Sequence, residues 1–390
     1  MANYWNLIKE KLLNEKGVLS IGFSDIIGAG ISAGFWFYVA SVITPENYGE
    51  IHYFLGIAGL IQIVSMIGNA HSLTVYSAKN ENIQSTLFLL SIIPTIISCI
   101  IIGFLFNRID TGILALGYVI FESVNAVTLG RKYYSKYAKL IIIQKILTVI
   151  IGISFLYGFG YEGIIFALGL TFVPHTIIFI KEFKNNKIQF NLLKSKRSFI
   201  INNYIVKLSG GLGGQIDKII LAPLLGFTLL GNYSLSLQIF SILVIFSSIT
   251  FKYLLPQDSS GISNRNLKKI LILISIVISI LGIIVLPKII PVFFPKFIQT
   301  VDAISIMSIA VVPETITMLY MSKILGKEKS KIILISKLFS LSILIIGFIL
   351  IGPIMGIIGL ALVMVLSSVT QTGILATSEI STKRRLKKDE

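Results

Sequence analysis

Several charged side chains fall inside long apolar stretches of this chain, where charges are rare, and six of them could act on a substrate or an ion. They are Asp25, Glu122, Lys207, Asp217, Lys218 and Glu314. A charge at the centre of a bilayer costs roughly 3 kcal/mol on insertion scales, so residues that carry this cost usually face a cavity or a buried partner. The six are therefore our candidates for lining a substrate cavity or coupling an ion.

Some intramembrane polar residues have a simpler explanation. Lys145, Lys207 and Lys337 lie about two helical turns from one end of their apolar stretches, so their aliphatic stems can carry the ammonium to the interface. We favour this snorkelling for Lys145 and Lys337, and Lys218 can reach the opposite interface in the same way. His175 follows a proline near a helix end, and we expect it to be structural.

The acidic residues are harder to explain without a cavity or a partner. Asp25 and Asp217 are too short to snorkel far. Glu122 and Glu314 lie near the middle of their stretches, and Pro313 removes a backbone donor beside Glu314. Asp217 is expected to face the cavity or to meet a basic group such as Lys207.

Sequence patterns for catalysis are missing. Cys99 is the only cysteine, and the three histidines, His52, His71 and His175, lack metal-ligand spacing. The "GGLGG" run lacks the strand-turn-helix context of a dinucleotide site. The longest external loop that we expect, near 288–298, is too short to hold catalytic groups. The sequence therefore favours transport over an enzymatic reaction and predicts no cofactor.

The composition is that of an all-α protein that crosses the membrane many times. Hydrophobic residues make up 54% of the chain and charged ones 13%, with a mean hydropathy of +0.87, whereas soluble domains are about 25% charged. A helix needs about 20 apolar residues to span a bilayer. Twelve stretches qualify: 18–43, 48–68, 83–106, 111–129, 139–158, 162–181, 200–225, 229–251, 269–287, 299–322, 331–351 and 354–378.

The basic residues predict the orientation. With both termini in the cytoplasm, 27 of the 34 Lys and Arg fall in cytoplasmic segments and three in external loops, a strong positive-inside bias. The net charge of +16 is then explained by topology and by anionic lipid, so we expect no nucleic acid partner. Residues 1–17 place Trp5, Ile8 and Leu12 on one face, which predicts an interfacial helix, and 379–390 form a basic cytoplasmic tail.

Two similar halves are indicated. The polar segment 182–199 is expected to be a cytoplasmic linker between an N-lobe (18–181) and a C-lobe (200–378) of six helices each. Six crossings return the chain to the same side, so repeats would be parallel and related by an axis along the membrane normal. The first helix of each half carries a glycine cluster and an aspartate, with G-x-x-x-G spacing at Gly30/Gly34 and Gly210/Gly214. This spacing permits close helix approach or bending.

With the helices placed, three motifs resemble one family, the Wzx-like polysaccharide flippases of the multidrug/oligosaccharidyl-lipid/polysaccharide exporter superfamily. The first is "TPENYG" at the end of the first span, the second is Asp217 followed by Leu225-Gly226, Gly231 and Tyr233, and the third is "GPIMGIIGLAL" from Gly352. The resemblance covers the whole chain and implies a MATE-like fold. One departure is that Ser72 and Tyr76 stand where relatives often carry an arginine.

The resemblance implies a flippase that moves a polyprenyl-(pyro)phosphate-linked oligosaccharide across the cytoplasmic membrane by alternating access. Lys207 and Lys218 would balance pyrophosphate charge, and the aspartates would bind sugar hydroxyls or a coupling ion, Na⁺ or H⁺. Partners would be membrane lipid and other glycan-assembly proteins. Two alternatives remain open: a multidrug-extrusion-type cation antiporter, in which acids such as Asp25 bind the ion, and a membrane enzyme of cell-envelope glycan assembly.

Overall fold

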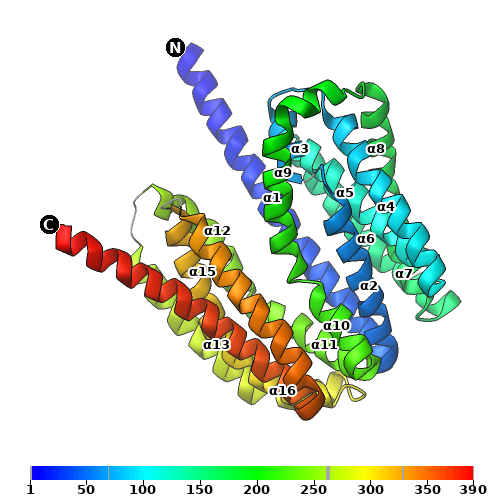
Figure 1. Ribbon diagram of the computed structural model, residues 1–390, viewed down its shortest axis with the longest axis vertical. Coiled ribbons are helices and arrows are strands. Elements are labelled where there is room, and N and C mark those ends of the chain that lie inside the picture. The colour runs from blue at the N-terminus through cyan, green and yellow to red at the C-terminus, as the bar shows by residue number, and fades with distance from the viewer. Residues whose placement is uncertain (1, 69, 261–263, 327–328, 390) are drawn as a thin grey trace. The chain divides into compact units, whose positions relative to one another are not determined.

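The structure, a computed structural model, describes residues 2–68, 70–260, 264–326 and 329–389, and every regular element in these ranges is helical (Figure 1). In chain order the elements are α1 (Ala2–Val42), α2 (Pro45–Ser65), α3 (Ala70–Ala78), α4 (Gln84–Phe106), α5 (Ile109–Gly130), α6 (Tyr134–Phe159), α7 (Gly163–Leu170), α8 (Val173–Asn185), α9 (Phe190–Leu212), α10 (Ile216–Leu225), α11 (Phe227–Leu243), α12 (Ile245–Ser259), α13 (Arg265–Phe293), α14 (Gln299–Met307), the 3₁₀ turn η1 (Ser308–Ala310), α15 (Val311–Gly326) and α16 (Ser330–Asp389).

The helices reproduce the predicted spans. Seven described helices are long and apolar enough to cross a membrane, and three bent pairs pass the same test when each pair counts as one span. The pairs are α2 with α3, α7 with α8, and α11 with α12. One of the seven, α16, contains two predicted spans, and the remaining prediction, 200–225, corresponds to α9 and α10. Each predicted span therefore has a helical counterpart.

α16 is a helical hairpin. Ser340 and Ser367 hydrogen-bond through their hydroxyls at 2.6 Å, although 27 residues of straight helix would separate them by about 40 Å. The chain reverses at Gly356, whose φ of 56° lies in the left-handed region that glycine adopts without strain. A Cβ at Gly347 would lie 2.5 Å from the Val363 side chain, so the two arms are closely packed, as Figure 1 shows in orange and red.

Three predicted non-spanning segments are largely helical. Residues 2–17 continue into the first span as part of α1 without a break, and the side chains of Trp5, Ile8 and Leu12 lie outside the described part. Within 182–199 only residues 186–189, between α8 and α9, are non-helical. The tail continues α16, and Glu379 pairs with Lys323 at 2.5 Å. The interfacial and cytoplasmic positions of these segments stay predictions.

The chain divides into two compact units that differ from the sequence halves. Unit 1 comprises residues 1–39 and 54–215, and unit 2 comprises 40–53 and 216–390. Residues 40–53, which include the start of α2, therefore pack with the second half of the chain. The predicted lobes, 18–181 and 200–378, were drawn from topology and similarity, and they stay a prediction.

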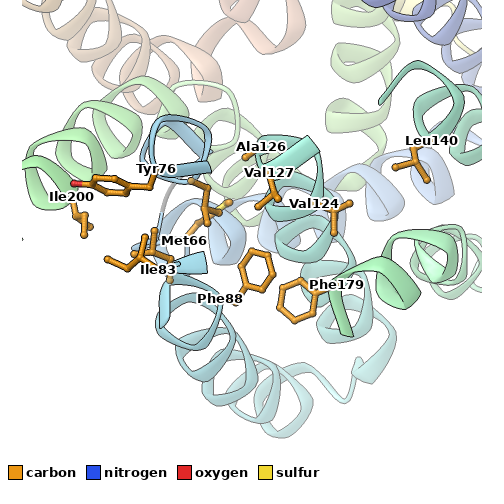
Figure 2. Packing of buried hydrophobic residues seen from close by; sticks show 12 residues of the cluster. Met66, Tyr76, Ile83, Phe88, Val124, Ala126, Val127, Leu140, Phe179 and Ile200 are labelled. Atoms are coloured by element: carbon orange, nitrogen blue, oxygen red, sulfur yellow. The ribbon is translucent and has the colours of Figure 1, made fainter. Parts of the chain in front are cut away.

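Unit 1 is built around α5, which packs against α3, α4, α6, α7 and α8. Its core joins aliphatic and aromatic side chains from α3, α4, α5 and α8 (Figure 2). Phe88 and Phe179 stack with ring centroids 4.3 Å apart, and both are buried. This packing fixes α5, the helix that carries Glu122.

Unit 2 contains the tightest helix crossing that we find. A Cβ at Gly231 on α11 would overlap the Pro45 carbonyl oxygen, and a Cβ at Gly49 on α2 would overlap the Phe227 carbonyl oxygen. The two backbones therefore touch where two of the sequence motifs meet, with Tyr48 and Tyr233 fully buried beside them. Only glycine fits at these two positions, because the obstacles are backbone atoms.

Within unit 1, the expected close approach at Gly30 and Gly34 is not found. Apart from the backbone of α1 itself, no atom of the described part of unit 1 lies within 4 Å of a Cβ built at either residue, and both are exposed on α1. The second glycine cluster interrupts the helix that was predicted over 200–225. Its residues end α9 at Leu212, and tight bonds from Gly214 N to Gly211 O and from Gln215 N to Leu212 O precede the start of α10.

Candidate functional site

Glu122 and Lys207 form an ion pair inside unit 1. The Lys207 Nζ lies 2.5 Å from Glu122 Oε1, and the Gln62 side-chain amide donates to Oε2 of the same carboxylate. Glu122 comes from α5, Lys207 from α9 and Gln62 from α2. The side chains of Glu122 and Lys207 remain 18% and 30% exposed, so both are accessible to a small ion or a ligand group.

Local contacts between α9 and α2 help to set this geometry. The Tyr204 hydroxyl donates to the Val64 carbonyl oxygen at 2.6 Å, which anchors α9 one turn before Lys207. A Cβ at Gly211 would lie 3.0 Å from the Ile63 side chain, so an alanine there would require that side chain to shift by a few tenths of an ångström. Sequence reasoning selected Glu122 and Lys207 but missed Gln62, because a neutral amide among apolar residues carries no charge signal.

Asp217 is placed differently from the expectation that it lies within one long helix. The break at 213–215 puts it in the first turn of α10, where backbone N–H groups lack helical partners. Its Oδ1 accepts the Lys218 backbone N–H at 2.8 Å, and its side chain is buried. Lys207, which was suggested as a basic partner for Asp217, pairs with Glu122 instead, and the expectation that Asp217 faces the cavity stays a prediction. A helix N-terminus favours a carboxylate, which accounts for an acidic residue here.

Charged and aromatic residues of unit 2 gather near Asp217. Its carboxylate interacts electrostatically with the Lys218 ammonium and with the buried Tyr233 hydroxyl. Lys218 also acts on His52, whose ring lies 4.5 Å from that of Tyr48. Sequence reasoning considered His52 only as a metal ligand and therefore missed it.

The other two acidic candidates have polar neighbours of their own. Glu314 hydrogen-bonds with Ser368 and is attracted by Lys337, so this lysine has an acidic neighbour in the second half. Pro313 lies in the first turn of α15, where a missing N–H is tolerated. Asp25 on α1 accepts a hydrogen bond from the Tyr137 hydroxyl at 3.3 Å.

His175 fits the structural role that we expected. It is fully buried, and its ring centroid lies 4.8 Å from that of Phe121 and 6.3 Å from that of Phe172. Neither ring nitrogen has a hydrogen-bond partner in the described part of the chain. Among these residues no group of three His, Cys, Asp or Glu side chains is arranged to hold a metal ion.

Comparison with solved structures decides the fold. An inward-facing multidrug resistance MATE family transporter of the MOP superfamily superposes with a TM-score of 0.72 at 13% identity, covering 95% of this chain and 99% of that one. The lipid II flippase MurJ, in an inward closed conformation, gives 0.71 at 14%, covering 93% and 87%. MATE in complex with MaL6 gives 0.63 at 15%, covering 96% and 97%.

The chain has the fold of the MOP superfamily. It is an all-α, multi-pass membrane protein with the predicted MATE-like architecture. No family model matches the sequence, and no curated protein does. The similar structures are transporters and a flippase, which agrees at the level of the fold with the expectation that the chain is not an enzyme. At 13–15% identity the likeness to MOP-superfamily structures establishes the fold and assigns no substrate.

Asp217 allows a test of whether its charge or its hydrogen bond matters. Asp217→Ala is expected to abolish or severely reduce transport at normal protein level in the membrane, because it removes both the charge and the acceptor at the start of α10. Asp217→Asn retains an acceptor for the Lys218 N–H but removes the charge. The measurement is transport activity per molecule of membrane-inserted protein.

The chain contains a matched control for this experiment. Asp110, at the start of α5, accepts the Thr111 backbone N–H at 2.8 Å in the same way, and it also pairs with Arg108 at 2.9 Å. Asp110→Asn is therefore expected to show an upper limit for the general cost of changing an acid at a helix N-terminus. If Asp217→Ala transports at the wild-type rate, Asp217 is not a functional cavity residue.

Proposed function

We propose that this protein is a flippase that moves a polyprenyl-(pyro)phosphate-linked oligosaccharide from the inner to the outer leaflet by alternating access. The sugar head cannot cross hydrocarbon unaided, because its hydroxyls would lose their hydrogen bonds. A MATE-like fold supports the proposal, since MurJ, a lipid II flippase, has the same architecture. The Wzx-like sequence motifs support it further. The substrate identity, the cytoplasmic membrane location and the cytoplasmic termini belong to the proposal.

The observation that carries this proposal is the reachable ammonium of Lys207 within a membrane-spanning unit. A pyrophosphate entering a low-dielectric cavity needs a positive partner. Glu122 holds the Lys207 ammonium through the ion pair, and Gln62 in turn holds the Glu122 carboxylate through its amide. A phosphate oxygen that replaces Glu122 leaves this carboxylate without its cation, so it takes up a coupling ion, H⁺ or Na⁺. Lys207 is thus proposed as the phosphate ligand and Glu122 as the coupling group.

A MATE-type cation antiporter is the second candidate, and the MATE structures favour it as strongly at the level of the fold. In that case Asp25, Glu122, Asp217 and Glu314 would bind the coupling cation, and the cargo would be a small cationic compound. Lys207 favours an anionic cargo instead, because its ammonium can exchange the Glu122 carboxylate for a phosphate oxygen, whereas a cationic substrate offers it no acceptor.

Deleting the gene separates the two candidates. For a flippase, lipid-linked oligosaccharide is expected to accumulate on the cytoplasmic face while the mature surface glycan is depleted, and the wild-type gene should restore both pools. Both pools are measured, the first by its accessibility to a membrane-impermeant probe in inverted and right-side-out vesicles. Normal pools together with reduced efflux of cationic dyes would overturn the flippase proposal in favour of the antiporter.

A further inference from the structure

A basic pocket in unit 1 is lined by none of the six candidate residues. It has a volume of about 510 Å³ and is formed by the end of α3, the turn after it, and the first half of α9. The polar side chains in its wall are those of Tyr76, Lys79, Glu81, Ser195, Lys196, Ser198 and Asn202. None of these residues takes part in the function proposed above.

The wall from α3 is held by a well-defined helix ending. Asn80 adopts φ = 55°, and its N–H bonds to the Ser77 carbonyl while the Glu81 N–H bonds to the Tyr76 carbonyl at 2.9 Å. These two bonds make a Schellman motif, which satisfies the last carbonyls of a helix. The motif places Lys79 and Glu81 two residues apart on the rim of the pocket, so their positions are fixed by backbone bonding.

Positive charge exceeds negative charge in this pocket. The Lys196 ammonium pairs with Glu81 and lies 4.5 Å from the centroid of the Tyr76 ring. Lys79 is close enough to act on Lys196 by repulsion, and partial burial together with this repulsion lowers the pKa of Lys196. The pocket wall therefore holds two ammonium groups and one carboxylate, so a second anion would relieve the repulsion between the two ammonium groups.

The position along α9 indicates a ligand at the membrane surface. The helix is polar from Phe190 to Ser198, and its apolar stretch begins at Phe199, which lines the pocket and is 41% exposed. Tyr76 packs edge-on against Phe199 at 5.7 Å, and aromatic residues are typical of the interface between hydrocarbon and water. In the predicted topology, this order would place the basic and hydroxyl groups of the pocket at headgroup level and Phe199 toward the acyl region.

We propose that this pocket binds the phosphate of an anionic membrane lipid. Lys79 and Lys196 would contact the phosphate oxygens, with the Ser198 hydroxyl and the Asn202 amide as further donors, and Phe199 would contact the upper acyl chain. The proposal is independent of the cargo, because it rests on the pocket alone. Its test measures binding, so it can fail without affecting the proposed flippase activity.

The proposal is tested by native mass spectrometry of the full-length protein in detergent. The protein is titrated with phosphatidic acid or, for comparison, with phosphatidylcholine. Lys79→Gln/Lys196→Gln is expected to weaken phosphatidic acid binding by about 25-fold, at about fivefold for each lysine near an anionic headgroup. Lys136→Gln/Lys187→Gln is a matched control, because both lysines are exposed and lie in predicted cytoplasmic segments. The two substitutions also remove the same total charge as those in the pocket. It should bind within about twofold of the wild type.

A variant that is expected to strengthen binding shows whether misfolding explains the weaker binding of the lysine variant. Glu81→Gln removes the competing carboxylate, so it is expected to tighten phosphatidic acid binding, an effect that a damaged fold does not produce. Competition with soluble pyrophosphate shows whether the pocket recognises the phosphate group alone or the whole lipid. Displacement of the lipid means that the phosphate group is sufficient for binding, and no displacement means that the rest of the lipid is also needed. Equal phosphatidic acid binding by the pocket variant and its control would overturn the proposal, as would weaker binding by Glu81→Gln.

Discussion

Gly231→Ala is expected to prevent the accumulation of folded protein in the membrane. Its Cβ would overlap the Pro45 carbonyl oxygen and lie 2.7 Å from the carbonyl carbon, and neither is the end of a flexible side chain. Ordinary overpacking costs about 1–3 kcal/mol, and a backbone obstacle should cost more, against a total stability of about 5–15 kcal/mol. Gly49→Ala should act in the same way, because it meets the Phe227 carbonyl across the same crossing.

The measurement is membrane yield together with the size-exclusion profile and thermal transition of the detergent-solubilised protein. Gly30→Ala is the matched control, since a Cβ there meets no atom within 4 Å in the described part of the chain. It should behave as the wild type, because alanine is also the better helix former. A monodisperse Gly231→Ala protein with an unchanged transition would show that α2 and α11 do not touch in this way.

Glu122→Gln and Lys207→Gln are each expected to lower stability, and their combination should restore much of the loss. Removing one partner of a fully buried pair costs about 3–5 kcal/mol, and of an exposed pair less than about 1 kcal/mol. This pair is partly exposed, so we expect about 1–3 kcal/mol for each single variant. The double variant leaves no uncompensated charge, so its thermal transition should lie closer to that of the wild type.

Transport should follow a different pattern from stability. If Lys207 binds the cargo phosphate, the double variant is expected to stay at least about tenfold slower than the wild type, the value of one charge-assisted contact. Lys145→Gln is the control, because its stem lies along Gly28 and we expect its ammonium to reach the interface. A double variant that regains both stability and transport would show that the pair is structural only.

Much of the fold could be predicted from the sequence, because membrane spans are recognised by a local property. Hydropathy over about 20 residues is enough to place a helix in a bilayer, and even the hairpin in α16 appears as two adjacent apolar stretches. The ends of helices were also partly visible, since the glycine cluster before Asp217 does interrupt the chain.

Contacts between distant residues could not be predicted in this way. Both Gly30 and Gly231 look suited to close packing, and only the three-dimensional arrangement shows that the second one faces another backbone. Likewise, nothing in the sequence selects Glu122 rather than Asp217 as the partner of Lys207, because they are 85 and 10 residues away. Intramembrane charge marks candidate residues, whereas their pairing depends on which helices become neighbours.

The assignment of residues 40–53 to unit 2 has a consequence for biosynthesis. The ribosome makes this segment early, but the backbone on which it packs, around Gly231, is made about 180 residues later. At about 5–20 residues per second, the nascent chain must wait roughly 10–40 seconds before the crossing can form. During this interval the second unit has no complete core, so its assembly depends on a segment already inserted. A second half produced as a separate polypeptide would lack that segment, and cutting the gene in the linker would not yield two self-sufficient folding units.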